Sequence, residues 1–156
     1  MDRYDPNEWT ESFVKSEASF CMQTLRNINE TVAALIDERN YPPAVAGLDR
    51  ILNGLITFQN AGADVRPHLC LFSWLEAEVI AFGMDAPEDY RRKTALSLFE
   101  DARDFAKSQN TRDNLSVIIV DLKTGVPLNK IRDEYEPDFP DSVIEGLANL
   151  QEELHI

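Results

Sequence analysis

The segment from Pro67 to Phe82 reads PHLCLFSWLEAEVIAF, and it decides the fold class. Its apolar residues surround most of a helical circumference instead of forming one stripe. They are Leu69, Cys70, Leu71, Phe72, Trp74, Leu75, Val79, Ile80 and Phe82. A surface helix has one apolar face, whereas a helix that is apolar on most sides is enclosed by other elements. The segment therefore predicts a central helix, which the rest of the chain has to cover.

Two segments before it carry the three-and-four spacing of amphipathic helices. Residues 7–39 predict either one long helix or two abutting helices, which Asn40-Tyr41-Pro42-Pro43 ends because proline lacks a backbone donor. Residues 44–59 predict a second helix, closed by Asn60-Ala61-Gly62. The first stripe is Phe13, Phe20, Cys21, Leu25, Ile28, Val32, Leu35 and Ile36; the second is Val45, Leu48, Ile51, Leu52, Leu55 and Phe58.

The segments after Phe82 predict three further helices. Gly83 is a helix stop, and Asp85 with Glu88 forms a capping box for a helix that runs to about Ser108. Its stripe is Ala95, Leu98, Phe99, Ala102, Phe105 and Ala106. Pro127 opens a short helix through Leu128, Ile131 and Tyr135. Asp141 caps a last helix through Val143, Ile144, Leu147, Leu150 and Leu154.

The segment Leu115–Leu122 is ambiguous. Its β-branched residues suit a buried strand, while the positions of Leu115, Ile118, Ile119 and Leu122 suit a helix. We favour a helix, because a lone strand would leave backbone groups without partners. The prediction is a single all-α domain over 1–156, with six to seven helices in an irregular bundle or stacked helical hairpins. The alternative is an α+β fold with a strand near 115–121.

Composition narrows the class of protein. A chain of 156 residues with 44% hydrophobic residues can bury a sizeable core. It has no apolar run long enough to cross a membrane, and its first residues do not form a signal peptide. Cys21 and Cys70 are isolated cysteines in apolar surroundings, which favours two small buried side chains over a disulfide. We therefore expect a cytoplasmic protein without membrane association.

The charge is unevenly distributed. The formal net charge is −13, and no Lys or Arg follows Arg132. The acidic C-terminal region, residues 133–156, contains Asp133, Glu134, Glu136, Asp138, Asp141, Glu145, Glu152 and Glu153. Such a region repels nucleic acid and anionic membrane and attracts basic surfaces. An acidic region of this kind is also typical of a solubilising helix face that only contacts solvent.

A search for catalytic and metal-binding patterns yields little. The sequence has no phosphate-binding glycine loop and no zinc spacing, and His68 is expected at a helix start rather than in a catalytic set. The pairs Glu8/Glu11 and Asp101/Asp104 have a spacing that suits magnesium, but we interpret both as solvated faces. Glu152 and His155 form a single Glu-x-x-His pair, whereas a di-iron site needs two. We expect no metal or other cofactor.

One stretch resembles part of a known family. The segment from Thr111 to Val120, TRDNLSVIIV, is similar to the closing Asp-Asn motif of metal-dependent serine/threonine protein phosphatases. The resemblance implies that Asp113 is a metal ligand followed by a strand. It covers about 25 residues, and the family's Asp-Gly-x-x-Gly-His motif is absent from this sequence. A single carboxylate does not make a two-metal site.

These observations favour a non-enzymatic protein that binds another protein. The hypothesis is a bacterial or phage adaptor, antagonist or immunity-type inhibitor that engages a basic protein surface and does not bind nucleic acid directly. The candidate partner-binding residues are Glu134, Glu136, Asp138, Asp141 and Glu145. The alternatives are a magnesium-dependent hydrolase and a scaffold or oligomerisation module, which would include a homodimer.

Overall fold

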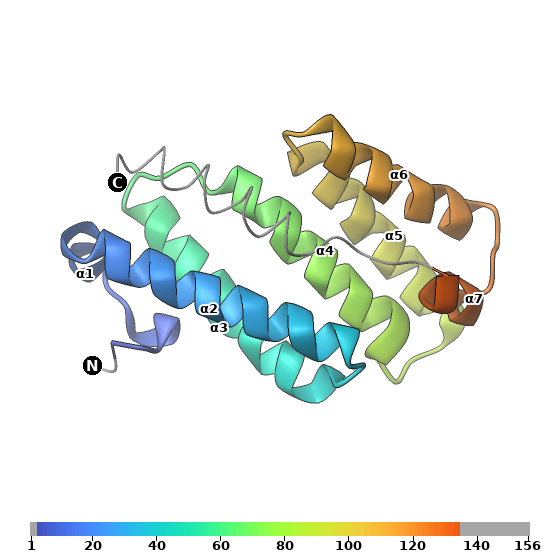
Figure 1. Ribbon diagram of the computed structural model, residues 1–156, viewed down its shortest axis with the longest axis horizontal. Helices are drawn as coiled ribbons and strands as arrows, with labels where there is room; N and C mark the ends of the chain where they lie inside the picture. The colour runs from blue at the N-terminus through green and yellow to red at the C-terminus, as the bar shows by residue number, and fades with distance from the viewer. Residues whose placement is uncertain (1–2, 135–156) are drawn as a thin grey trace.

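The predicted central helix is present as α4 (Arg66–Gly83) in the computed structural model, which describes residues 3–134 (Figure 1). Those residues form a short 3-10 helix and seven α-helices, and no strand occurs among them. The other elements are η1 (Pro6–Glu8), α1 (Glu11–Ser16), α2 (Ala18–Asp37), α3 (Tyr41–Asn60), α5 (Glu88–Phe105), α6 (Gln109–Lys123) and α7 (Leu128–Glu134). The all-α prediction is confirmed.

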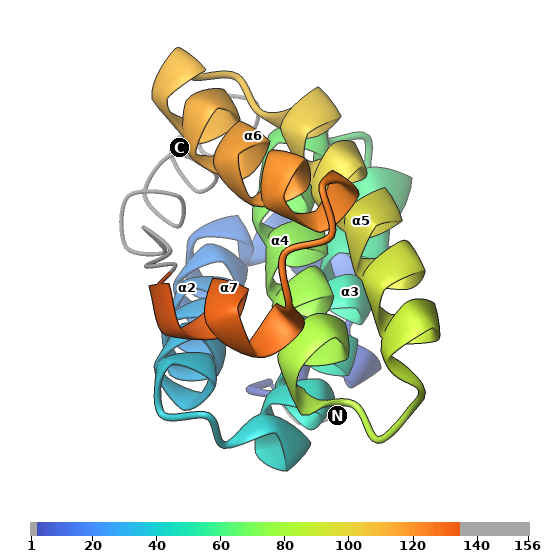
Figure 2. The same ribbon diagram turned by 90° about the vertical axis from the view of Figure 1, so that its right-hand side faces the viewer.

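α4 lies in the middle of the fold because it packs against α2, α3, α5 and α7. Figure 1 shows α2 and α3 on one side of it and α5 and α6 on the other. Seen from the end in Figure 2, α7 crosses close to the ends of α2 and α4. The side chains of Trp74, Leu75 and Ala77 are completely buried, as expected for an enclosed helix. Consecutive helices are neighbours, so the arrangement consists of successive helical hairpins.

The N-terminal stripe forms two abutting helices rather than one. Thr10 caps α1 by accepting a hydrogen bond from the backbone N–H of Phe13 over 3.1 Å. Glu17 then leaves the helical conformation, with φ −123° and ψ 41°, and α2 begins directly after it. The following helix starts earlier than its apolar stripe, at Tyr41, because Pro42 and Pro43 fit a first turn that needs no backbone donors.

The segment Leu115–Leu122 lies within α6, so the strand alternative is wrong. Its buried residues are Leu115, Ile118, Ile119 and Leu122, the helical subset, whereas Val117 and Val120 are exposed. α7 confirms the short helix after Pro127 as far as Glu134. Tyr135 and the helix predicted from Asp141 lie outside the described residues.

Two details of the α4–α5–α6 connections correct the sequence-based predictions. The capping box of Asp85 and Glu88 does not form, because α5 begins at Glu88 with Pro87 at its N-cap and no side-chain cap. α5 also ends at Phe105, before Ser108. Ser108 instead caps α6, where its hydroxyl accepts a hydrogen bond from the backbone N–H of Thr111. Local spacing therefore suggested a cap that does not form and missed the cap that Ser108 provides.

Gly83 ends α4 as predicted, but close packing explains the glycine better than backbone conformation does. A Cβ atom at this position would lie 2.3 Å from Cγ of Tyr41. Tyr41 is the first residue of α3, so the start of α3 and the end of α4 meet here. Along the part of the chain that the structure describes, no helix is long and apolar enough to cross a membrane.

Candidate functional site

A groove of about 380 Å³ lies between α3 and α4. Tyr41, Val45 and Leu52 line it from α3, while Phe72 and Ile80 line it from α4. Because the two helices are antiparallel where Tyr41 meets Gly83, the groove runs along both of them from that end. Its walls are mostly apolar, which is typical of ligand and helix-binding sites.

The groove leaves apolar side chains open to solvent. Val45 is 46% exposed, and Met84, which follows α4 directly, is 42% exposed. Both line the same groove, and Leu52 and Ile80 beside them are only partly buried. Single exposed apolar residues are ordinary, but a continuous exposed apolar surface indicates a binding site.

Tyr41 closes one end of the groove. Its ring packs on the backbone of Gly83, and burial raises the pKa of its hydroxyl, with a smaller contribution from the nearby charge of Glu78. The hydroxyl is therefore neutral at ordinary pH.

Two carboxylates interrupt the apolar lining. Asp49 comes from α3 and Glu76 from α4. Burial raises the pKa of Glu76, and the negative charge of Asp49 raises it further, which indicates that the two groups are neighbours. Within residues 3–134, no Lys or Arg forms an ion pair with either of them. The groove is therefore apolar with one negative position.

Other polar groups lie in the core, away from the groove. His68 is in the first turn of α4, close to the predicted helix start, but it is completely buried. Its Nε2 lies 3.0 Å from Nδ2 of Asn29, which also donates to the carbonyl of Leu25 over 2.8 Å. Asn29 is fully buried as well. This contact joins α2 to α4 inside the core.

Glu78 is a buried carboxyl group of α4, with 4% of its surface exposed. Burial raises the pKa of its carboxyl to about 8; a hydrogen bond from Trp74 lowers the pKa, and the charge of Asp37 raises it. The group is therefore mostly protonated at neutral pH. Cys21 and Cys70 are buried as predicted, and burial raises the pKa of the Cys21 thiol to about 12.

The carboxylates considered for metal binding are not brought together. Among residues 3–134, no group of three His, Cys, Asp or Glu side chains is placed to hold a metal ion. Glu8, Glu11, Asp101 and Asp104 are each exposed, as solvated faces require. Glu152 and His155 lie outside the described residues.

Asp113 lies on α6, where its Oδ1 accepts a hydrogen bond from Nε2 of Gln109 over 2.7 Å. The strand that the phosphatase resemblance implied after this residue is therefore wrong. The β-branched run after Asp113 is helical, and its residues Val117 and Val120 are exposed.

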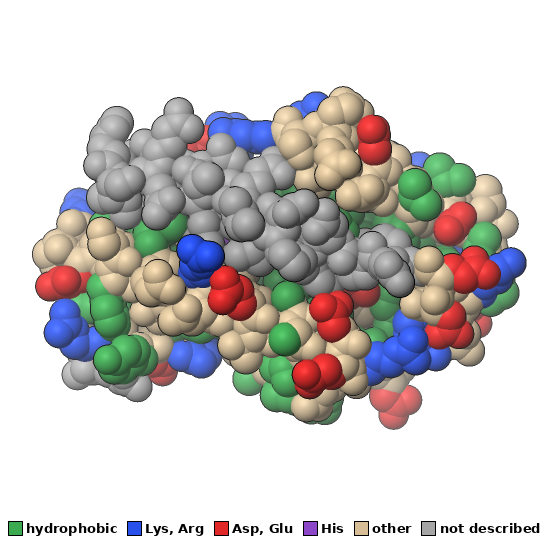
Figure 3. Space-filling view, viewed as in Figure 1, with side chains coloured by type: hydrophobic (Ala, Val, Ile, Leu, Met, Phe, Trp, Pro, Cys, Tyr) green, Lys and Arg blue, Asp and Glu red, His purple; other side chains and the backbone are tan. Residues whose placement is uncertain are grey.

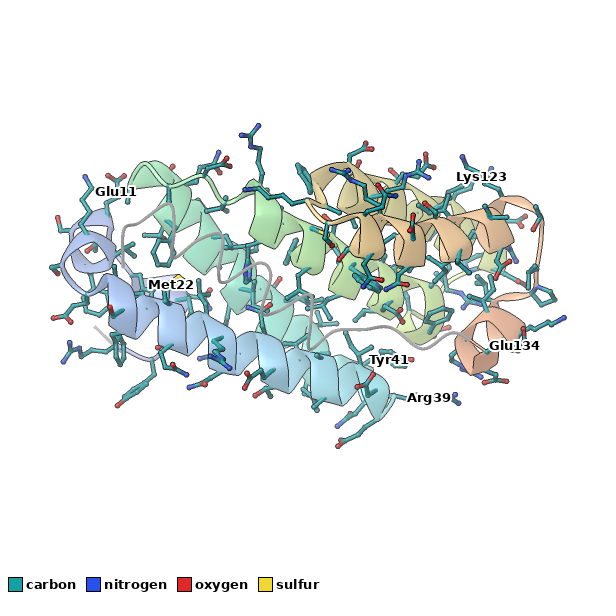
Figure 4. The ribbon with its side chains drawn as sticks, turned by 45° about the horizontal axis from the view of Figure 1, so that its top comes forward. Glu11, Met22, Arg39, Tyr41, Lys123 and Glu134 are labelled. Carbon is teal, nitrogen blue, oxygen red and sulfur yellow. The ribbon has the colours of Figure 1, made fainter. Side chains whose placement is uncertain are left out.

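Of the predicted partner-binding residues, the structure describes only Glu134. It is exposed near the end of α7, and Figure 4 shows it at the same end of the molecule as Arg39 and Tyr41. Arg39 there pairs with Asp133 over 3.2 Å. Glu136, Asp138, Asp141 and Glu145 lie outside the described residues. On the face in Figure 3, the described acidic and basic side chains are interspersed.

Sequence reasoning missed the groove, although it assigned Val45, Leu48 and Leu52 to an apolar stripe. The stripe showed which face of α3 is apolar, but not that α4 leaves part of it uncovered. Comparisons with protein-family models, curated proteins and solved structures found no match for this chain.

Proposed function

We propose that this chain is a non-enzymatic binding protein that docks a helical segment of another protein in the groove between α3 and α4. The observation that carries the proposal is the exposed apolar lining of that groove, with Val45 and Met84 each close to half exposed. Exposing such side chains is unfavourable in water, and a partner that covers them restores the lost hydrophobic stabilisation.

The dimensions of the groove fit a helix. Its lining on α3 extends from Tyr41 to Leu52, which at 1.5 Å per residue corresponds to about 16 Å, or three helical turns. A helix-in-groove interface uses apolar anchors spaced over two or three turns. The groove has two apolar ends, which are spaced to receive two such anchors. One end contains Val45 and Met84, and the other contains Leu52 and Phe72.

Charge favours a basic partner over a second copy of the chain. The formal net charge of −13 makes two copies repel each other, and each groove adds Asp49 and Glu76 to that repulsion. A basic protein is attracted instead. The proposal therefore keeps the adaptor or antagonist class predicted from the sequence, and the acidic C-terminal region supports it as a source of long-range attraction.

The test is site-specific photo-crosslinking in the source cell. A photoreactive amino acid replaces Val45 in the full-length chain, and a matched variant carries it at Ser97, which is exposed on α5. We expect the Val45 variant to form an adduct with another protein through a basic amphipathic segment, identified by mass spectrometry, and the Ser97 variant to form none with that segment. A Val45 adduct only with a second copy of this chain, or labelling equal to that at Ser97, would overturn the proposal.

A further inference from the structure

We infer that the groove selects a partner helix that carries a Lys or Arg between two apolar anchors, with the cation held by Asp49 and Glu76. The inference rests on the proposed function and adds the chemistry of the segment that binds. It assigns the selectivity of the groove to two carboxylates contributed by different helices.

The two carboxylates lie part-way along the groove, on different helices. Asp49 lies one turn after Val45 on α3, and Glu76 lies one turn after Phe72 and one turn before Ile80 on α4. All five residues line the groove. The negative position therefore lies between the two apolar ends, where a bound helix covers it from solvent.

Residues 3–134 supply no counter-ion to Asp49 and Glu76. Arg50 follows Asp49 directly, but its Nη2 donates to the carbonyl of Tyr4 over 2.8 Å and its Nε lies 3.8 Å from Asp5. Arg66, the first residue of α4, pairs with Asp64 over 2.7 Å. Both of these arginines are engaged elsewhere. The nearest basic side chains along α3 and α4 therefore leave the groove negative.

Covering the two carboxylates has an energetic cost that depends on the partner's side chains. A helix that covers Asp49 and Glu76 with neutral side chains removes water from two neighbouring anions and provides no favourable electrostatic interaction to compensate for the lost hydration. A helix with a cation at that position offsets both the lost hydration and the mutual repulsion. Discrimination of this kind arises from the penalty on the wrong partner as much as from attraction to the right one. An ion pair that is partly covered contributes more than an exposed pair, for which the typical gain is small.

The spacing of the lining residues gives a register for the partner. Val45, Asp49 and Leu52 are separated by four and three residues on α3. A helix lying along α3 meets them in order with an apolar residue, a cation four residues on, and a second apolar residue three further. Such a pattern places all three side chains on one face of the partner helix.

The experiment uses two labelled synthetic helical peptides of about 18 residues. One carries the pattern Leu-x-x-x-Lys-x-x-Leu, and the other has Gln in place of Lys. Fluorescence anisotropy measures their affinities for the full-length protein. Because one partly covered ion pair contributes on the order of 1 kcal/mol, we expect the Lys peptide to bind roughly five- to tenfold more tightly than the Gln peptide. D49N/E76Q should remove that preference and leave the Gln peptide's affinity equal or higher.

A control variant, D101N/D104N, removes two exposed carboxylates from α5 and the same amount of charge. It should keep the preference for Lys, and circular dichroism checks that both variants are folded. Equal affinities of the two peptides for the unmodified protein would overturn the inference, as would a preference for Lys that persists in D49N/E76Q. Failure of both peptides to bind would also overturn it, while cross-linking through Val45 decides the proposed function independently.

Discussion

Glu78 is a carboxyl group that folding removes almost completely from water, so its protonation and the stability of the fold are linked. In the unfolded chain the pKa of Glu78 is near the ordinary 4.5. In the folded chain the pKa is raised to about 8, and burial is the largest cause. Between these values the unfolded chain releases a proton that the folded chain keeps. The free energy of unfolding contributed by Glu78 is therefore greatest below 4.5 and falls as the pH rises to about 8.

Substituting Glu78→Gln should remove this pH dependence. An amide cannot ionise, so the variant loses a slope of up to about 1.4 kcal/mol per pH unit within that window. Urea unfolding at a series of pH values measures the slope. Glu11→Gln, at an exposed position on α1, is the matched control and should keep the slope of the unmodified protein. A slope that persists in Glu78→Gln would contradict the assignment.

The close packing of Gly83 against Tyr41 can be tested by substitution. An added methyl group would lie 2.3 Å from Cγ and 2.7 Å from Cβ of Tyr41, so the start of α3 has to move. Alanine in an open helix position stabilises relative to glycine, but here we expect Gly83→Ala to lower the free energy of unfolding by about 1–3 kcal/mol. Chemical denaturation checks this. If the clash is the cause, the same substitution should cost much less in a Tyr41→Gly background, which lacks both the ring and the Cβ atom.

Between helices, Arg92 fastens α5 to the end of α6. Its Nη1 donates to the carbonyl of Leu122 over 3.2 Å, and its Nη2 donates to the carbonyl of Val126 over 2.9 Å. Its side chain is only 19% exposed. We expect Arg92→Met to cost about 1–3 kcal/mol and to speed amide hydrogen exchange from Leu122 to Ile131. Lys93→Met, at the exposed neighbouring position, should change neither; equal effects of the two variants would refute the role of Arg92.

At the scale of elements, periodicity predicted most helices because each apolar stripe can be read from one segment of the sequence. α6 is an example, since Leu115 and Ile118 have helical spacing within a β-branched run and are buried on one side of a helix. The Asp85 and Glu88 cap was wrong because cap spacing recurs by chance and tertiary packing determines where a helix begins. The groove could not be predicted, because the exposure of Val45 depends on how α3 and α4 pack together.

For the whole molecule, the net charge and the groove should affect different steps of partner binding: the net charge should affect association, and the groove should affect dissociation. Charges at a distance from the contact accelerate encounter, and their effect weakens as salt screens them over about 10 Å at moderate ionic strength. Apolar side chains in the interface act mainly on dissociation. The acidic C-terminal region holds eight carboxylates and no Lys or Arg, whereas the groove holds two carboxylates within an apolar surface.

Replacing Glu134, Glu136, Asp138 and Asp141 with amides should therefore slow association with the partner that cross-links through Val45. The variant should also weaken the dependence of the association rate on salt, and leave the dissociation rate within about twofold. Ile80→Ala in the groove should do the opposite, with faster dissociation and an unchanged salt dependence. Surface plasmon resonance at two salt concentrations separates the two effects. If the amide variant associates as fast as the unmodified protein at low salt, the acidic C-terminal region plays no part in binding and the groove acts alone.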